Sequence, residues 1–426
     1  MTALLLQETL PTGVNYTRPI VVLFVPYLIQ LDAIFKKTPA STLQHYFSWI
    51  LIQNYAENLA GPYKQPWLAF QSVLPEYFLT DKLERWESYV SIVNSNLDHL
   101  IGYYFIRETF KGNSRKEVMA MINNIISTYE ENFKSTAWLD KVTRDAAIKK
   151  LKATTKVIGY STHSPDDTSK SVDTFYKGYS IAATDFFANQ VQHSIWSSTY
   201  SFSQVNLPVD REGMNSLITV VNSNNHLGMS KINMPAGTLQ NLFFHLGNPE
   251  YLNYANTGFI GGHEIGWWTE APELAFTEKA QCFVGQYGNF TIKGPDNKDY
   301  NVNGEITLSE NLSHNSGIKI SFHAWQSHFK SDPHSKKYDS LASFLIFFIS
   351  HRNHVPHADA KGVEKYTVEQ SFFIAYGRQW CGKRTPELAV RLLHLDVHSP
   401  DSVRINGPVQ NSPDSQRPST ALLEVS

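Results

Sequence analysis

One apolar stripe constrains the fold of this chain more than any other stretch. Apolar side chains recur at intervals of three and four residues from Val118 through Ile122 to Phe133, which is the spacing of one helix face. Ser114 and Glu117 precede the stripe at the positions of a capping box, in which both side chains bond to the backbone at a helix start. The stripe predicts a long amphipathic helix that is buried along one face.

The expected secondary structure differs between the first part of the chain and the rest. Residues 1 to about 135 have the pattern of helices. A further helix is expected from about Asp140, with Val142, Ala146 and Leu151 facing inward. From about Lys156 the segments become shorter and alternate with polar loops. We therefore predict a mainly α fold with some β structure, of the α+β class.

The composition limits the classes of function. The chain has 426 residues, of which 42% are hydrophobic and 13% aromatic, enough to build a sizeable core. Its net charge is −2 and it has no long basic run, so nucleic acid is not expected as a partner. The apolar run from Val21 to Ile29 is interrupted by Pro26 and is shorter than the roughly 20 residues that span a bilayer. No membrane anchor or signal peptide is visible, and the compartment is not predicted.

The segment from Gly261 to Trp268 holds half of a zinc-binding motif. In a complete H-E-x-x-H, two histidines share one helical face and bind zinc, and the glutamate is the general base that activates water. His263 and Glu264 match the first two positions, but Trp267 stands at the second histidine. An indole nitrogen is a donor only and cannot bind zinc. Alone, the pair is weak evidence for a metal site.

Further stretches strengthen this evidence because they follow in a fixed order. They are RETF at 107–110, WLD at 138–140, MPAGTLQ at 234–240, QCFVGQYGNF at 281–290, LSENLSH at 308–314, WCG at 380–382 and DVHSP at 396–400. With these stretches, the chain resembles the neprilysin/endothelin-converting-enzyme family of zinc endopeptidases from about Arg85 to about Ser412.

The resemblance implies a two-lobed molecule. A helical lobe covers the active-site cavity in this family, and residues 1–150 are expected to be a remnant of it. Residues 151–412 are expected to form a thermolysin-like peptidase lobe. Residues 413–426 form a Pro/Ser-rich tail that diverges from the family.

The resemblance also implies a zinc site. It assigns zinc ligation to His263 and Glu310 and general-base catalysis to Glu264. The family has an aspartate four residues after its glutamate ligand, where this chain has His314. Because these two positions share a helical face, His314 is a possible substitute zinc ligand. The alternative, which we favour, is that it lies behind the ligands as the aspartate does.

Three further residues are expected to contact the substrate. The resemblance assigns to His398 a catalytic hydrogen bond that stabilises the transition state. It assigns binding of the substrate backbone to Asn222 and Arg404. The expected partners are therefore small peptides, and the expected cofactor is zinc.

The missing histidine makes the activity of the chain an open question. Trp267 to Thr269, followed by Gln281 and Cys282, resembles family sequence well beyond the second histidine, which indicates a deletion. We expect zinc to bind weakly or not at all, and peptide hydrolysis to be weak or lost. Two alternatives stay open: a non-catalytic peptide-binding pseudoenzyme, and the product of a truncated splice form or a gene-model error.

The chain has two cysteines, Cys282 and Cys381. Both stand at positions that resemble disulfide cysteines of the family, whose usual partners have no counterpart here. We expect both to be unpaired and buried, as small apolar side chains.

Overall fold

The long predicted helix is present. Helix α7 spans Ser114–Ser135 and buries Val118, Met121, Ile122 and Ile125 along one face. The structure is a computed structural model that describes residues 24–59, 61–73, 84–161, 169–205, 207–241, 243–257, 269–331 and 366–415. The apolar stripe therefore predicted both the helix and its buried face.

The predicted start of α7 is wrong in detail. Ser114 is the first residue of the helix, and its hydroxyl donates to the carbonyl of Lys111 at 2.9 Å. Asn113 is the N-cap residue, and its side chain makes no capping hydrogen bond. A capping box forms instead at helix α15, Val368–Arg378, where Thr367 and Gln370 bond reciprocally. Ser114 fails as a cap because its hydroxyl is used by the preceding turn.

The chain divides into two compact units. One contains Met1–Ile92 and Asp173–Asp210, and the other contains Val93–Val172 and Arg211–Ser426. The predicted lobe boundaries near residues 150 and 412 stay a prediction.

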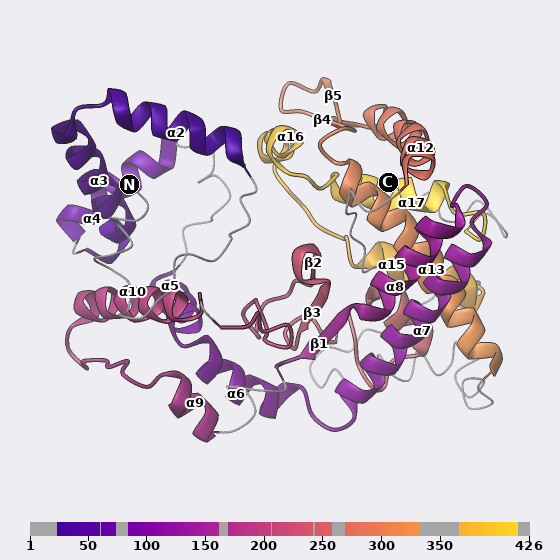
Figure 1. Cartoon of the computed structure of the whole chain (residues 1–426), viewed down its shortest axis with the longest axis horizontal. Coiled ribbons are helices and arrows are strands. Elements are labelled where there is room, and N and C mark those ends of the chain that lie inside the picture. Colours follow the sequence, from indigo (N-terminus) through magenta and orange to yellow (C-terminus); the bar gives the residue numbers. More distant parts are fainter. Residues whose placement is uncertain are drawn as a thin grey trace. The chain divides into compact units, whose positions relative to one another are not determined.

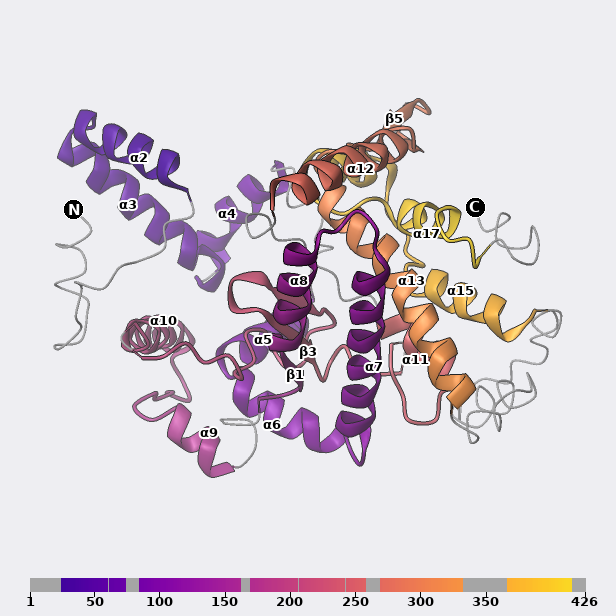
Figure 2. The same cartoon turned by 45° about the vertical axis from the view of Figure 1, so that its right-hand side comes forward.

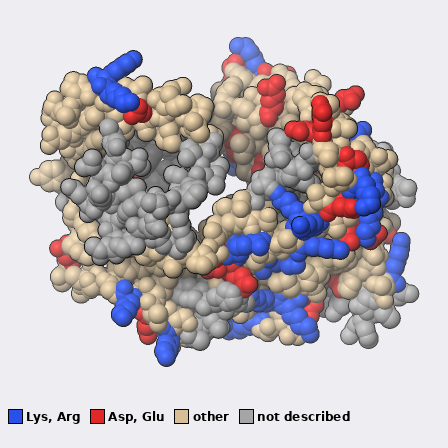
Figure 3. Space-filling model, viewed as in Figure 1, with Lys and Arg blue, Asp and Glu red and all other residues tan. Residues whose placement is uncertain are grey.

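The first unit is built from helices. Its helices are α2 (Val25–Lys37), α3 (Ala40–Tyr55), the short 3₁₀ helix η1 (Ala56–Asn58), α4 (Gly61–Val73), the start of α5 (Arg85–Asn96), the end of α9 (Ser169–Phe175) and α10 (Phe186–Ser203). Neither α2 nor α3 buries any residue, and large apolar side chains such as Ile29 and Trp49 are exposed on them. Figure 3 shows that the surface over these helices, at the upper left, is mostly uncharged.

The second unit contains the remaining elements. Its helices are α6 (Asp98–Thr109), α7, α8 (Lys141–Ala153), η3 (Leu227–Met229), α11 (Glu250–Thr257), α12 (Glu270–Gly288), α13 (Leu308–Ser331), α15, α16 (Pro386–Leu395) and α17 (Asp401–Gln410). Its strands are β1 (Thr155–Gly159), β2 (Asn224–His226), β3 (Lys231–Pro235), β4 (Thr291–Lys293) and β5 (Asp299–Asn301). The described chain is thus mainly helical with a few short strands, as predicted.

The strands form two small sheets. β3 lies between β1, to which it is parallel, and β2, to which it is antiparallel. All five residues of β3 are buried, including Lys231, whose ammonium group donates to the carbonyl of Gly213 at 2.8 Å. β4 and β5 form an antiparallel hairpin.

Helix α13 passes through the core of the second unit. Figures 1 and 2 both show it alongside α7, and it also packs on α11 and α17. Its residues Ile318, Phe322 and Trp325 are buried together with Phe372 of α15. The side-chain amide of Asn124 on α7 donates both to the carbonyl of Ala324 and to a tyrosine hydroxyl of α11, at 2.8 Å each. The central turns of α13 are therefore fixed by the core.

Helix α8 begins where predicted but presents another face to the core. Asp140 is its N-cap, and the carboxylate accepts the backbone N–H of Thr143 at 2.7 Å. Thr143 and Ala147 are buried, whereas the predicted inward residue Val142 is 67% exposed. This face of α8 is buried because the hydroxyl of Thr143 bonds to that of Thr269, the residue before α12, at 2.8 Å. Asp140 accepts the hydroxyl of Thr269 as well.

The cysteine prediction is half right. Cys282 and Cys381 are unpaired as expected, but both are exposed, so the expected burial is wrong. None of the helices in the described part of the chain has the length and hydropathy to cross a membrane.

The packing of α7 and α8 can be tested by two truncations. Ile122→Ala should lower the free energy of unfolding by about 2–5 kcal/mol, because it leaves a cavity in the core. Val142→Ala, on the exposed face of α8, should change it by about 0.5 kcal/mol or less. Denaturant unfolding, read as a change in midpoint at constant slope, measures both. A loss for Val142→Ala as large as that for Ile122→Ala would contradict the orientation of α8.

Candidate functional site

The predicted zinc-type glutamate lies at the start of the central helix. Glu310 is in the first turn of α13, where the positive end of the helix dipole favours a carboxylate. Its side chain is 35% exposed, and its carboxylate lies 3.5 Å from Nε2 of His398. The carboxylate thus stays open to solvent on a rigid element.

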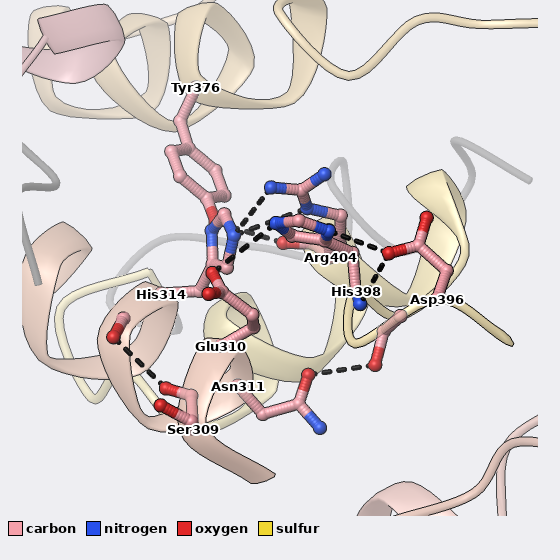
Figure 4. Close-up of polar contacts among 10 residues, drawn as sticks. Ser309, Glu310, Asn311, His314, Tyr376, Asp396, His398 and Arg404 are labelled. Carbon is pink, nitrogen blue, oxygen red and sulfur yellow. Dashed lines mark hydrogen bonds and ion pairs between the residues drawn. The ribbon is translucent and has the colours of Figure 1, made fainter. Parts of the chain in front are cut away.

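His398 is held by the loop between α16 and α17. Its backbone N–H and its Nδ1 both bond to Oδ1 of Asp396, at 2.9 and 2.7 Å. Burial acts to raise the pKa of Asp396, but the hydrogen bonds from His398 outweigh it and keep this pKa below its ordinary value. Because Nδ1 is used by Asp396, Nε2 is the nitrogen that faces Glu310 (Figure 4).

A buried hydrogen bond joins this loop to α13. The hydroxyl of Ser399 donates to the side-chain oxygen of Asn311 at 2.7 Å, and both residues are almost fully buried. These two residues directly follow His398 and Glu310 in the sequence. The bond therefore fixes the position of the loop that carries His398 against the helix.

Arg404, on α17, lies against two rings. Its Nε and Nη2 both donate to Nε2 of His314, at 3.1 and 2.9 Å. Its guanidinium carbon lies 3.6 Å from the centre of the Trp380 ring, which is cation–π geometry. Burial lowers the pKa of Arg404. The residue is half-buried.

The hydrogen bonds around His314 fix its protonation. Nε2 must accept, because the guanidinium of Arg404 can only donate. Nδ1 therefore carries the proton and donates to the hydroxyl of Tyr376 at 3.1 Å, which in turn donates to the carbonyl of Arg404 at 2.8 Å (Figure 4). Burial, followed by the charges of Arg404 and His398, lowers the pKa of His314 well below 6.5. The imidazole is neutral.

The hydrogen bonds of His314 can be compared with what a zinc ligand requires. A metal ligand must offer a lone pair, but one ring nitrogen of His314 accepts from Arg404 and the other carries a proton. In this arrangement His314 does not fit a zinc site.

The remaining predicted residues are placed differently. Asn222 is exposed just before β2, and its carbonyl accepts the hydroxyl of Thr238 at 2.9 Å. Within the described ranges, no hydrogen bond joins Asn222 to His398 or Arg404. His263 and Glu264 lie outside the described residues. The part of the chain that the structure describes contains no group of three His, Cys, Asp or Glu side chains placed to hold a metal.

Two residues of the site were missed from the sequence. Tyr376 lies in the apolar run of α15, where its hydroxyl gives no signal. Ser399 lies within the stretch DVHSP, where its hydroxyl gives no signal of its own. In both cases the partners, Arg404 and Asn311, are distant in the sequence.

Comparison with known proteins decides the family. Two family profiles, both described as Peptidase family M13, match residues 2–161 and 222–417, together more than half of the chain. The chain belongs to peptidase family M13. The resemblance found from the sequence motifs is therefore confirmed.

The M13 relatives are longer than this chain. Mouse membrane metallo-endopeptidase-like 1 is 29% identical over 92% of this chain and 50% of the relative. Human neprilysin is 28% identical over 96% of this chain and 53% of its own length. The chain thus spans about half the length of these relatives.

Solved structures of M13 proteins share the fold. The zinc metalloprotease Zmp1 of Mycobacterium tuberculosis, in complex with an inhibitor, has a TM-score of 0.75 at 20% identity, over 98% of this chain and 62% of that protein. PepO of Lactobacillus rhamnosis has a TM-score of 0.69 at 22% identity, over 94% of this chain and 59% of that protein. These similarities confirm the predicted fold class, the two-lobed, mainly helical peptidase fold.

The neutral His314 predicts how stability depends on pH. Its pKa is lower in the folded state than the ordinary value near 6.5, so the unfolded chain binds the proton more tightly. Its contribution to stability is therefore complete above about pH 6.5 and is lost as the pH falls, by at most about 1.4 kcal/mol per pH unit.

His314→Gln isolates this contribution, because glutamine can accept from Arg404 and donate to Tyr376 without titrating. Unfolding free energies of both proteins between pH 7.5 and 5 measure it. The wild type should lose more stability in acid than the variant, and parallel profiles would contradict the neutral, buried imidazole.

Proposed function

We propose that this chain is a peptide-binding M13 protein whose zinc-dependent peptidase activity is weak or lost. The observation that carries the proposal is the contact of His398 Nε2 with the carboxylate of Glu310 at 3.5 Å, beside the half-buried Arg404. These side chains come from α13, from the loop between α16 and α17, and from α17, and they lie close together (Figure 4). Such an arrangement suits a peptide backbone.

Each residue has a defined chemical task in this proposal. With Nδ1 on Asp396, the protonated form of His398 donates from Nε2 to a carbonyl oxygen as that oxygen gains negative charge. Arg404 donates to a second oxygen of the peptide. Asn222, next to the short edge strand β2, contributes backbone groups that pair with an extended peptide. Glu264 serves as the general base for the attacking water.

The residues present fit zinc only in part. Glu310 offers a partly exposed carboxylate oxygen, which is a suitable zinc ligand. With His263, it would hold the ion, whose chemistry when bound is to make water more acidic. Trp267 stands where the family has its second histidine. With two of three ligands, we propose that zinc is held weakly or not at all.

Non-catalytic peptide binding is the second candidate function. It is favoured by the arrangement of Arg404 and His398, which depends on hydrogen bonds to His314, Asp396 and Tyr376. None of these bonds requires a metal. A peptide site of this kind persists when hydrolysis is lost.

Metal analysis tests the zinc part of the proposal. The purified chain, incubated with zinc and then dialysed, should hold well below one zinc per molecule, because loss of even a supporting contact typically costs about 10–100-fold in affinity. His263→Ala should lower the residual binding and His314→Ala should leave it unchanged. One tightly held zinc per chain, lost in His314→Ala, would show that His314 is a ligand after all.

A peptide library tests the catalytic part. With zinc present, the chain and its Glu264→Gln variant should both bind peptides and show little or no difference in cleavage. The variant removes the general base and keeps the shape of the side chain. Glu305→Gln, at an exposed residue before α13, is the matched control. Rapid cleavage that survives Glu305→Gln and disappears in Glu264→Gln would establish an active peptidase and contradict the proposal.

A further inference from the structure

Helices α2 and α3 of the first unit expose apolar side chains of the kind that usually fill an interior. Ten large apolar side chains on these two helices are between 47% and 65% exposed. On α3, the exposed residues Trp49, Leu51 and Ile52 point in different directions, because each helical residue is turned by about 100° from the last. A helix with apolar residues on several sides is normally buried, and an apolar patch of this extent marks a contact surface.

The two helices form one continuous surface. A connection of two residues joins them, and the rings of Phe35 on α2 and Phe47 on α3 lie 6.2 Å apart between their centres. At the end of α3, Tyr55 packs on Phe187 of α10 with ring centres 5.6 Å apart. The helix pair is therefore attached to the first unit through the end of α3, and the apolar side chains along its length stay accessible.

The charge of this surface indicates what covers it. Helix α3 contains no Asp, Glu, Lys or Arg, and α2 contains only Asp32, Lys36 and Lys37, which agrees with the largely uncharged surface in Figure 3. Asp32 and Lys36 pair with each other at 2.6 Å. In a symmetric dimer a patch meets its own copy, so an uncharged patch avoids contacts between like charges. Helices that lie on membranes carry Lys and Arg on a polar face, which α3 lacks.

The size of the surface fits a second copy as well. A large apolar side chain offers roughly 150–250 Å² when it is fully exposed. With about half of each exposed, the ten side chains present about 1,000 Å², and a stable complex buries about 800 Å² on each partner. We propose that α2 and α3 form the interface of a homodimer, in which each copy covers the apolar helices of the other.

Analytical ultracentrifugation of the full chain tests the interface. At about 10 μM the wild type should sediment as a dimer of 48.4 kDa chains, since interfaces of this size bind in the micromolar range or more tightly. The double substitution Trp49→Lys and Ile52→Lys should raise the dissociation constant at least about 100-fold, because like charges then face each other. Val142→Lys, at an exposed residue of the second unit, is the matched control and should leave the dimer intact.

A charge swap tests whether the partner is a second copy. The double substitution Trp49→Glu and Ile52→Glu should also give a monomer, and an equal mixture of the lysine and glutamate variants should restore the dimer. Both positions are exposed and both new residues favour helix, so thermal unfolding should show that the monomers are folded.

Three outcomes would overturn the proposal. A wild type that stays monomeric at every concentration would leave the surface to a different protein. A dimer that survives both double substitutions would place the interface elsewhere. Flotation of a monomeric wild type with phosphatidylcholine vesicles, lost in the lysine variant, would assign the surface to lipid.

Discussion

The site depends on the burial of α13. This helix packs on α7, α11 and α17. The side-chain amide of Asn124, on α7, donates to both α13 and α11 and so holds the three helices together. Since a helix held in this way cannot slide, Glu310, Asn311 and His314 at its first turns become fixed points. The loop that carries His398 and the helix that carries Arg404 are then located by hydrogen bonds to these points.

A directional chain of hydrogen bonds orders the rest of the site. Arg404 can only donate, so His314 must accept at Nε2 and donate at Nδ1, and Tyr376 must pass its own proton to the carbonyl of Arg404. One permanently charged side chain thereby sets the orientation of two others. His398 is oriented separately, through Asp396. The hydrogen bonds that orient Arg404 and those that orient His398 are consequently separate.

The sequence predicted the features that depend on a periodic pattern or on a short motif. The long helix, its buried face and the order of the family motifs could be predicted directly. Apolar periodicity and motif spacing are visible in the sequence without knowledge of the fold. Tyr376 and Ser399 could not be recognised, because a buried hydroxyl has meaning only through a distant partner. Val142 was assigned to the wrong face because Thr143 is buried by its bonds to Thr269, a contact that apolar periodicity cannot reveal.

The bonds of Thr269 to α8 have a consequence for how this chain can vary. The segment with His263 and Glu264 is bounded on one side by α11, which is buried from Tyr251 to Thr257. On the other side it is bounded by Thr269, which bonds to Asp140 and Thr143. Each anchor is held by contacts of its own, so residues can be gained or lost between them without displacing either. The segment with His263 and Glu264 can therefore change in length during evolution while the surrounding protein continues to fold. A change of this kind alters the catalytic residues without altering the fold around them.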